Sequence, residues 1–389
     1  MKMKAVKLED VCTIVSGGTP SRAKAEYWQG GNIPWIKISD IKGKFVNDTE
    51  ECITKEGLDG SSAKMLQKGT LLYTIFATLG EVGVLNIDAC TNQAIAGITI
   101  NKPEEVCSDY LYYYLKSKKS YVSGIGRGVA QNNINMSILR NFVVPLPSVE
   151  EQHSISRTLE KAHEIISSRK TELSILDDLI KARFVEMFGD PDTNPMCWSE
   201  CLLSEMLEVL GGYAFKSDGF SEVEGIPVLR IGNINAGFFK PVNMVFWEED
   251  EALERYAMYP GDLVMSLTGT VGKDDYGNVC ILGNNYCKYY LNQRNAKLEL
   301  KKGLDKYYLS QLLRFEKIKK RLTGINRGVR QANISNRDIL GLKVPIPPIE
   351  LQQQFSIFVA QVDKSKVVVQ KALDEAQLLF DSLMQKYFG

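Results

Sequence analysis

The clearest pattern of apolar and polar positions is a stripe that repeats in alternating steps of four and three residues, the spacing of a coiled-coil seam. It runs from Ile155 to Met187 and, at identical steps, from Phe355 to Tyr387. Each stretch follows a proline-rich turn and a Glu or Gln, as at a helix start. The pattern predicts two helices of about 38 residues, each ~57 Å long at ~1.5 Å per residue. Such a narrow stripe indicates that the helices pair with each other; the alternative is that each packs on its own domain.

The rest of the chain carries shorter patterns. Apolar runs of strand length, such as Leu71–Phe76 and Leu263–Leu267, are separated by Gly, Asn and Pro. A helical pattern follows each group of runs, "SDYLYYYLKSKKSYV" in the first half and "LDKYYLSQLLRFEKIKKRL" in the second. Strand-rich segments followed by helices predict an α+β fold.

The two halves of the chain repeat each other. Residues 124–189 align with residues 324–389 without a gap, and 18 of the 66 positions are identical. Two further blocks recur upstream in the same order: "IPWIKISDI" (33–41) with "IPVLRIGNI" (226–234), and "KGTLLYTIFATLG" (68–80) with "PGDLVMSLTGTVG" (260–272). The protein is therefore two diverged copies of one unit.

This duplication predicts four segments. We expect a mixed domain over 1–148, a helix and linker over 149–190, a second mixed domain over 191–345 and a C-terminal helix over 346–389. The linker prediction rests on "FGDPDTNPMCW" (188–198), in which two prolines interrupt the helical pattern.

Composition narrows the class of protein. With 44% hydrophobic residues, 24% charged residues and a formal charge of zero, the chain is typical of a soluble globular protein. No apolar run approaches the ~20 residues of a membrane span, and the N-terminus lacks a signal-peptide core. We expect a cytoplasmic protein with no membrane partner. None of the eight cysteines forms a C-x-x-C pair, so we expect reduced thiols, no structural metal and no cofactor.

Signatures of catalysis are missing. "GTVGKDD" lacks the spacing and the hydroxyl of a phosphate-binding loop. The only histidines, His153 and His163, both fall on the first predicted long helix, which leaves no credible Ser/His/Asp arrangement. "NIPW" (32–35) only superficially resembles the catalytic loop of amino-methyltransferases, and no glycine-rich cofactor loop lies nearby. These features predict a non-catalytic binding protein.

Basic residues gather at equivalent places in the two copies. From Tyr113 to Ser148 there are five Lys or Arg and no acid, and from Arg314 to Lys343 there are nine against two acids. Such patches suit the phosphate backbone of nucleic acids. The neighbouring loops "GRGVAQNNI" (126–134) and "NRGVRQANI" (326–334) supply donors that match guanine and adenine edges in the major groove.

These loops also have a purely structural interpretation, in which Gly sets the backbone and Asn and Gln bind main chain. Residues identical in both copies suit phosphate contact or loop shape, because they cannot read different sequences. Sequence reading should fall on residues that differ between the copies, such as Arg330 against Ala130, Arg230 against Lys37, and the unlike loops 42–62 and 213–225. The tyrosines at 112–114 and 307–308 could stack on bases or touch phosphate, but packing of the helix is favoured. The predicted DNA-contacting residues are Lys37, Lys116, Lys118, Lys119, Arg127, Gln131, Asn133, Arg230, Lys317, Lys320, Arg327, Arg330, Gln331 and Asn333.

The ordered set of motifs, "SGGTPS" (16–21), "IPWIKISDI", "GTLLYTIFATLGEVG", "GRGVAQNNI", "VPLPSVEEQ" and a long helix, all doubled, resembles the specificity subunits of type I restriction–modification systems. The resemblance covers essentially the whole chain. The sequence departs from the commoner pattern at "GGNIPW" and at "ATLGEVG", where a more polar loop is usual.

The resemblance implies two pseudo-symmetric target recognition domains joined by two long helices that form an antiparallel coiled coil. It implies a bipartite target on double-stranded DNA, two modification (methyltransferase) subunits as partners, and restriction (translocase and nuclease) subunits that join for cleavage. Two alternatives stay open: a fragment of a single-chain restriction or methylation enzyme, and an assembly scaffold without DNA contact.

Overall fold

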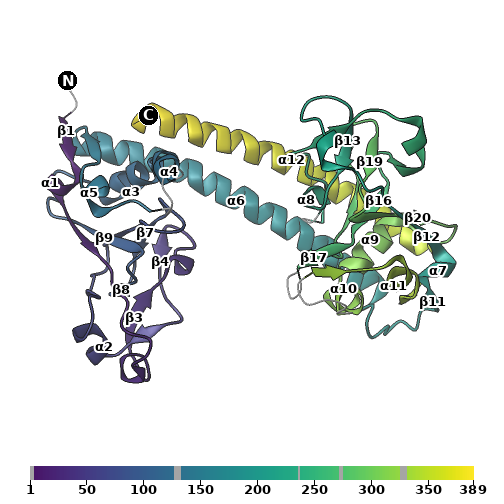
Figure 1. The fold of residues 1–389 in the computed structure, drawn as a ribbon, viewed down its shortest axis with the longest axis horizontal. Helices are drawn as coiled ribbons and strands as arrows, with labels where there is room; N and C mark the ends of the chain where they lie inside the picture. Colours follow the sequence, from purple (N-terminus) through teal and green to yellow (C-terminus); the bar gives the residue numbers. More distant parts are fainter. Residues whose placement is uncertain (1–3, 127–132, 235–236, 271–274, 325–330) are drawn as a thin grey trace. The chain divides into compact units, whose positions relative to one another are not determined.

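The computed structural model describes residues 4–126, 133–234, 237–270, 275–324 and 331–389. The chain forms two compact units. Unit 1 comprises Met1–Lys170 with Lys371–Gly389, and unit 2 comprises Thr171–Gln370. Figure 1 shows that each unit contains a mixed α/β domain and parts of both long helices, α6 (Val149–Phe188) and α12 (Ile349–Phe388).

Unit 1 is built on a five-stranded sheet of order β2-β9-β6-β7-β4, antiparallel except for the β4–β7 pair. Its strands are β2 (Cys12–Ser16), β9 (Ile95–Ile100), β6 (Leu71–Thr74), β7 (Val82–Leu85) and β4 (Phe45–Val46). A three-stranded sheet contains β5 (Cys52–Ile53), β3 (Ile33–Ile36) and β8 (Cys90–Thr91), and β1 (Lys4–Lys7) pairs with β10 (Val143–Leu146). The helices of this domain are α1 (Leu8–Val11), α2 (Lys55–Asp59), α3 (Ser108–Ser117), α4 (Lys119–Gly126) and α5 (Met136–Arg140).

Unit 2 repeats this plan with differences in the smaller sheets. One four-stranded sheet contains β12 (Leu207–Gly211), β20 (Asn295–Leu300), β16 (Leu263–Ser266) and β18 (Val279–Ile281). A second contains β14 (Val245–Trp247), β13 (Ile226–Leu229), β19 (Tyr289–Leu291) and β15 (Ala257–Met258). The two-stranded pairs are β11 (Glu200–Leu202) with β22 (Lys343–Pro345) and β17 (Thr268–Thr270) with β21 (Gln331–Asn333). Its domain helices are α7 (Leu203–Met206), α8 (Ile231–Ile234), α9 (Lys306–Arg314), α10 (Glu316–Thr323) and α11 (Asn336–Leu340).

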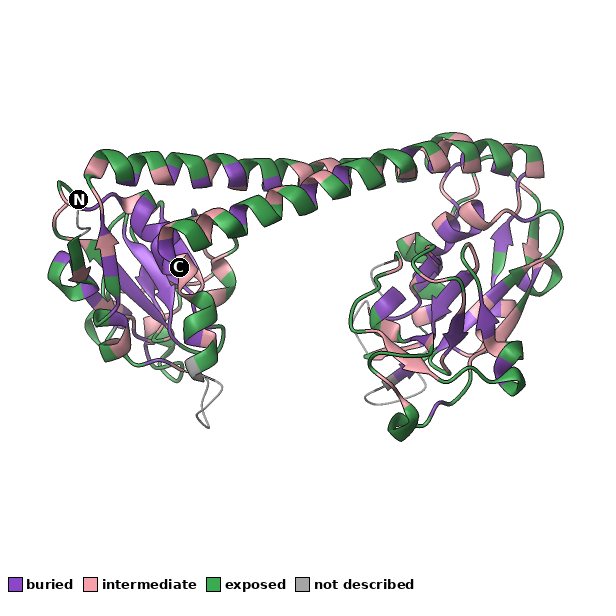
Figure 2. Cartoon of the chain, turned by 90° about the horizontal axis from the view of Figure 1, so that it is seen from above, coloured by how far each residue is buried: buried purple, intermediate pink, exposed green. Residues whose placement is uncertain are grey.

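The central strands are buried on both faces. All residues of β6 and of β16 are buried, which matches their unbroken apolar runs rather than an alternating pattern. Figure 2 shows the same concentration of buried residues in the sheets of each unit. The predicted α+β fold is confirmed.

Equivalent hydrogen bonds hold each long helix to the domain that precedes it in the sequence. The Tyr110 hydroxyl donates to the Pro145 carbonyl at 2.7 Å, and the Tyr308 hydroxyl donates to the Pro345 carbonyl at 2.8 Å. Gln152 and Gln352, both fully buried, accept from main-chain amides at 2.9 and 2.8 Å. The repeat in the sequence is therefore a repeat of three-dimensional structure.

The two long helices pair in antiparallel fashion inside each unit. In unit 1 the His163 ring of α6 lies 6.2 Å from the Phe380 ring of α12. In unit 2 the rings of Phe184 and Phe355 lie 5.5 Å apart. Residues late in one helix thus contact residues early in the other. The predicted pairing is confirmed.

Each helix also ends on the domain of the other copy. The Phe388 ring at the end of α12 lies 5.2 Å from the Tyr110 ring in unit 1, and the Phe188 ring at the end of α6 lies 4.9 Å from the Tyr308 ring in unit 2. The alternative of two helices packed only on their own domains is wrong.

The predicted seam is correct along much of each helix and wrong at the ends. Leu159, Ala162 and Ile166 are buried as expected, but Arg183, Met187 and Tyr387 are only half-buried. Their neighbours Phe184, Phe188 and Phe388 are buried instead. The stripe shifts there because these aromatic rings must pack against a domain as well as against the partner helix.

The tyrosines of α3 pack the interior, as favoured. Tyr112, Tyr113 and Tyr114 are at most 3% exposed, and the Tyr113 hydroxyl donates to the Glu160 carboxylate at 2.7 Å. Among the described residues, no helix is long and apolar enough to cross a membrane.

Candidate nucleic-acid interface

Two of the repeated sequence blocks meet in unit 2. Strand β17, which follows the buried strand β16, pairs with β21 so that Thr268 faces Asn333. The Ile334 amide donates to the Leu267 carbonyl at 2.8 Å. The end of α10 joins this cluster, since the Tyr276 hydroxyl donates to the Thr323 carbonyl at 2.7 Å. Described residues of the β16–β18 connection, the end of α10 and residues 331–334 therefore converge.

The same three segments converge in unit 1. Phe76 and Asn133 form an isolated antiparallel bridge, and the Ile134 amide donates to the Ile75 carbonyl at 3.0 Å. At the start of α4, Lys119 forms an ion pair with Glu81 at 2.5 Å. We call this arrangement the loop cluster; it comprises residues 75–82, 119–126 and 133–134 in unit 1, and residues 267–270, 275–278, 316–324 and 331–334 in unit 2.

A glycine permits the close packing in unit 1. Gly80 has φ of +79°, and a Cβ there would lie 2.9 Å from the Cα of Lys119. Both the backbone conformation and the close approach of α4 exclude a side chain. In unit 2 the buried Lys319 amine of α10 donates to the Asn278 side chain at 2.6 Å, which fixes the helix to the loop.

Several predicted contact residues belong to the loop cluster. Lys119 is exposed, Asn133 is half-buried and Asn333 is exposed. Arg127, Gln131, Arg327 and Arg330 lie outside the described residues, and Gln331 is described only through its backbone pairing with Thr270.

The lysines of α10 lie on its exposed surface, in ion pairs. Lys317 contacts Asp192 at 3.2 Å, and Lys320 contacts Glu316 at 2.5 Å. Hydrogen bonds from Arg321 and then Lys317 hold the pKa of Asp192 below its ordinary value. Exposed pairs of this kind contribute only ~0.2–1 kcal/mol each, so a phosphate could exchange with their carboxylates at small cost.

Lys116 and Lys118 are placed differently, against the end of α12 in unit 1. The Lys116 amine lies 5.6 Å from the Tyr112 ring and 6.0 Å from the Phe380 ring. The Lys118 amine donates to the Phe388 carbonyl at 3.4 Å. Burial lowers the pKa of both amines.

Lys37 and Arg230 follow the equivalent strands β3 and β13. Lys37 is half-buried and its amine donates to Glu51 at 2.6 Å. Arg230 is exposed, and its guanidinium donates to the Asn243 carbonyl. The two residues thus lie at equivalent places in the two units.

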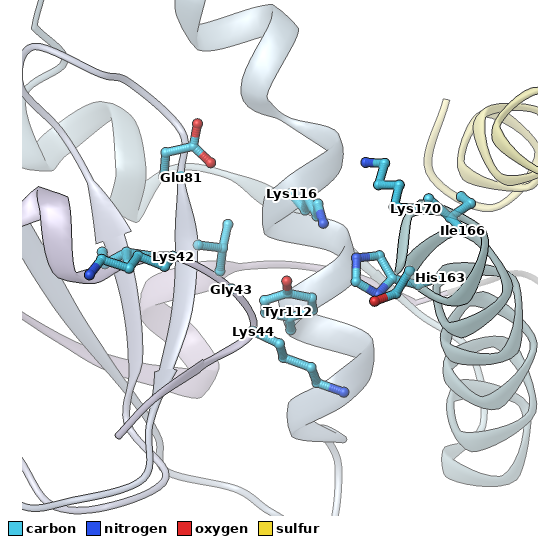
Figure 3. A pocket seen from close by; sticks show the side chains of 12 residues that line it. Lys42, Gly43, Lys44, Glu81, Tyr112, Lys116, His163, Ile166 and Lys170 are labelled. Carbon is cyan, nitrogen blue, oxygen red and sulfur yellow. The ribbon is translucent and has the colours of Figure 1, made fainter. Parts of the chain in front are cut away.

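The fold also brings together basic residues of unit 1 that lie far apart in the sequence. A pocket of about 400 Å³ is lined by Lys42, Lys44, Lys116, His163 and Lys170 among others. Figure 3 shows that these side chains come from the loop before β4, from α3 and from α6. Only Lys116 lies in the counted basic patch, because the others are spread over 129 residues of sequence, from 42 to 170.

A comparison with protein families decides what kind of protein carries this arrangement. The family model described as "Type I restriction modification DNA specificity domain" matches residues 1–175 and again residues 195–376. The chain belongs to the specificity subunits of type I restriction–modification systems. The double match corresponds to the two copies found in the sequence.

Relatives of this specificity subunit match over nearly its whole length. The MjaIX specificity subunit of Methanocaldococcus jannaschii is 26% identical over 98% of this chain and 91% of its own length. The EcoKI specificity subunit of Escherichia coli K12 is 22% identical over 97% of this chain and 86% of its own length.

A solved structure has the same fold. The S subunit of a type I system from M. genitalium superposes with a TM-score of 0.57 at 16% identity, over 100% of this chain and 96% of that one. At this sequence identity, the similarity establishes the fold of the specificity subunit alone. Its ligand contacts must be argued from its own residues.

Proposed function

We propose that this specificity subunit reads a bipartite target on double-stranded DNA, one half-site by each copy. The observation that carries the proposal is the loop cluster, which forms from equivalent segments in both units. Exposed Lys119 belongs to the cluster of unit 1, and exposed Lys317, Lys320 and Asn333 belong to that of unit 2. Lysines bind phosphate as point charges, while Arg, Gln and Asn match base edges.

We assign the residues shared by the copies to phosphate contact and the residues that differ to base reading. Arg127 and Arg327 belong to the first group, and Arg330, Arg230 and Lys37 to the second. The recognition domains are residues 1–148 and 191–345. The chain itself is non-catalytic, so that methyl transfer and cleavage come from partner subunits.

The long helices are the surface we assign to the modification and restriction subunits. They carry exposed apolar side chains that contribute to no core of this chain: Ile175 is 60% exposed, Val367 70% and Leu378 72%. Exposed apolar residues concentrated on one element mark protein interaction sites. A solved structure with a TM-score of 0.55 and 18% identity to this chain concerns complex assembly and conformational transition of the type I restriction–modification system.

The test is to map methylated adenines in cells that express the chain with its cognate modification subunit. A split motif should appear that is absent without the chain. Replacing residues 1–148 with the equivalent segment of another specificity subunit should change one half-site and leave the other intact. A change in both half-sites, or in neither, would refute the assignment of one reader to each copy.

Two controls separate this proposal from its rivals. The purified chain alone should bind duplex DNA with an affinity that falls as salt rises; no salt-dependent binding would favour a scaffold without DNA contact. The same preparation should transfer no methyl group from S-adenosylmethionine, and transfer by the lone chain would indicate an enzyme.

A further inference from the structure

The basic pocket of unit 1 concentrates positive charge on few side chains. In Figure 3 the side chains of Lys116 of α3 and Lys170 of α6 lie near the imidazole of His163, while the Lys42 amine points away from them. Lys44, Glu81 and Tyr112 also line the pocket. All these residues belong to unit 1.

Nearby carboxylates are already engaged. Glu81 pairs with Lys119 at 2.5 Å. Glu160 accepts from Lys44 and from the Tyr113 hydroxyl. Within the described parts of the chain, no carboxylate forms an ion pair with Lys42, Lys116 or Lys170. Glu81 and Glu160 still attract the Lys116 amine, but neither forms an ion pair with it, so these amines lack an ion-pair partner among the described residues.

The second copy has a different set of acids at the same place. There, Arg314 of α9 stands where Lys116 stands in α3, as the equivalent Tyr110 and Tyr308 hydrogen bonds establish. Asp177 and Asp363 attract the Arg314 guanidinium, as Glu81 and Glu160 attract Lys116, and Lys366 forms ion pairs with both aspartates.

Unit 1 has lost these acids. At a spacing of 200 residues, His163 replaces Asp363 and Gln377 replaces Asp177, while Lys170 is a new cation where the second copy has Gln370. Lys116 is half-buried, and burial costs its charged form hydration, whereas Lys42 and Lys170 are exposed. An external anion between Lys116, His163 and Lys170 would add negative charge where Asp177 and Asp363 supply it in unit 2.

We propose that the pocket of unit 1, where Lys116, His163 and Lys170 lie close together, binds a phosphate group. A tetrahedral dianion suits several convergent N–H donors better than a single carboxylate does, and lysine is a regular phosphate ligand. The phosphate could belong to the DNA backbone or to a free anion, and both sources present the same chemistry. The site is independent of whether the loop clusters read DNA.

His163 is a built-in reporter of this site. Burial lowers the pKa of its imidazole, and the charge of Lys116 lowers it further. Lys170 and Lys44 act in the same direction, while Glu160 opposes them. Glu81 also lines the pocket and is paired with Lys119, and the Phe380 ring of α12, 6.2 Å from the His163 ring, is uncharged. A bound phosphate adds negative charge, so it should raise the pKa of His163.

The experiment is an NMR titration of the full chain labelled at histidine, which contains only His153 and His163. Inorganic phosphate at millimolar concentration should raise the pKa of His163 relative to chloride at equal ionic strength. His153 is exposed and lies outside the pocket lining, so its pKa should stay unchanged. An equal response to chloride and phosphate, or no response, overturns the proposal.

Substitutions test which side chains hold the ligand. Lys116→Met and Lys170→Met should each weaken the phosphate response at least tenfold in concentration, while the exposed Lys64 of the same unit provides a matched control, Lys64→Met. A raised resting pKa of His163 in Lys116→Met reports that the pocket has folded, since a cation has gone. Wild-type responses in both pocket variants overturn the proposal.

A last arm identifies the source of the phosphate. If duplex DNA of arbitrary sequence raises the pKa of His163 and competes with inorganic phosphate, the backbone supplies the group. If only inorganic phosphate acts, the site takes a free anion. Either result supports phosphate binding in the pocket. Loss of bipartite methylation in separate mapping experiments would refute the proposal that the chain reads a bipartite target, and would leave the phosphate proposal unaffected.

Discussion

Replacing one buried glutamine should destabilise one unit and leave the other unchanged. Gln152 is fully buried in the first turn of α6 and makes three hydrogen bonds to main chain. Its carbonyl oxygen accepts from the Cys107 amide at 2.9 Å, and its amide donates to the Glu105 and Pro147 carbonyls at 2.9 and 3.1 Å. The side chain therefore connects the long helix to two loops of the recognition domain.

The magnitude follows from those three bonds. Methionine has a similar volume and no hydrogen-bonding capacity, so Gln152→Met leaves one amide and two carbonyls without this partner. At ~0.5–1.5 kcal/mol for each bond, the loss is roughly 2–4 kcal/mol. Since 1.4 kcal/mol corresponds to about a factor of ten, amides that exchange by opening of unit 1 should exchange about 30- to 1000-fold faster.

Hydrogen exchange followed by mass spectrometry can resolve the two units. Gln152→Met should accelerate exchange in α3 and β10 but not in α9 or β22. Gln352 makes the equivalent bonds to Asp305, Gly303 and Pro347, so Gln352→Met should show the reverse pattern. Gln67→Met, a substitution of an exposed glutamine, serves as the control. A loss below about 0.5 kcal/mol, the usual range for surface substitutions, would refute the reasoning.

Three further predictions concern the arginines, the helices and pH. Arg327→Ala should weaken binding to all duplexes and lower the slope of log affinity against log salt by about one. Arg330→Ala should cost ~1–3 kcal/mol of binding free energy only on targets with an intact second half-site. Equal effects of the two substitutions on scrambled half-sites would contradict the assignment of Arg327 to phosphate and of Arg330 to bases. Inserting seven residues after Lys170 and seven after Gln370 keeps the seam and lengthens each helix by ~10 Å. The spacer in the mapped methylation motif should then grow by about three base pairs at ~3.4 Å each. An unchanged spacer would show that the helices do not set its length. Burial acts to raise the pKa of Glu160, but hydrogen bonds from Lys44 and Tyr113 hold that pKa below its ordinary value. The stability that the ionised carboxylate gives is present at neutral pH and is lost as pH falls through the lowered pKa. The free energy of unfolding of Glu160→Gln in urea should therefore depend less on pH below 5 than that of the wild type.

Local patterns determined the architecture. The 18 identities at constant spacing required a duplication, and the steps of four and three required two long helices that pair. These features depend on residues close in sequence, where spacing alone decides which side chains share a face. The seam failed only where a third element entered: at Phe184, Phe188 and Phe388 the rings meet a recognition domain as well as a helix.

Tertiary structure decided which charges are neutralised. The segment from Tyr113 to Ser148 contains five basic residues and no acid. In the fold, however, Lys119 pairs with Glu81 on another element, while Lys116 faces Phe380 near the end of the chain. Likewise, Lys44 meets Glu160 across 116 positions. A charge pair forms wherever folding brings two side chains within about 4 Å, whatever their separation in sequence. A count within one sequence window therefore finds basic segments, and only the folded chain shows which of their charges remain available to a ligand.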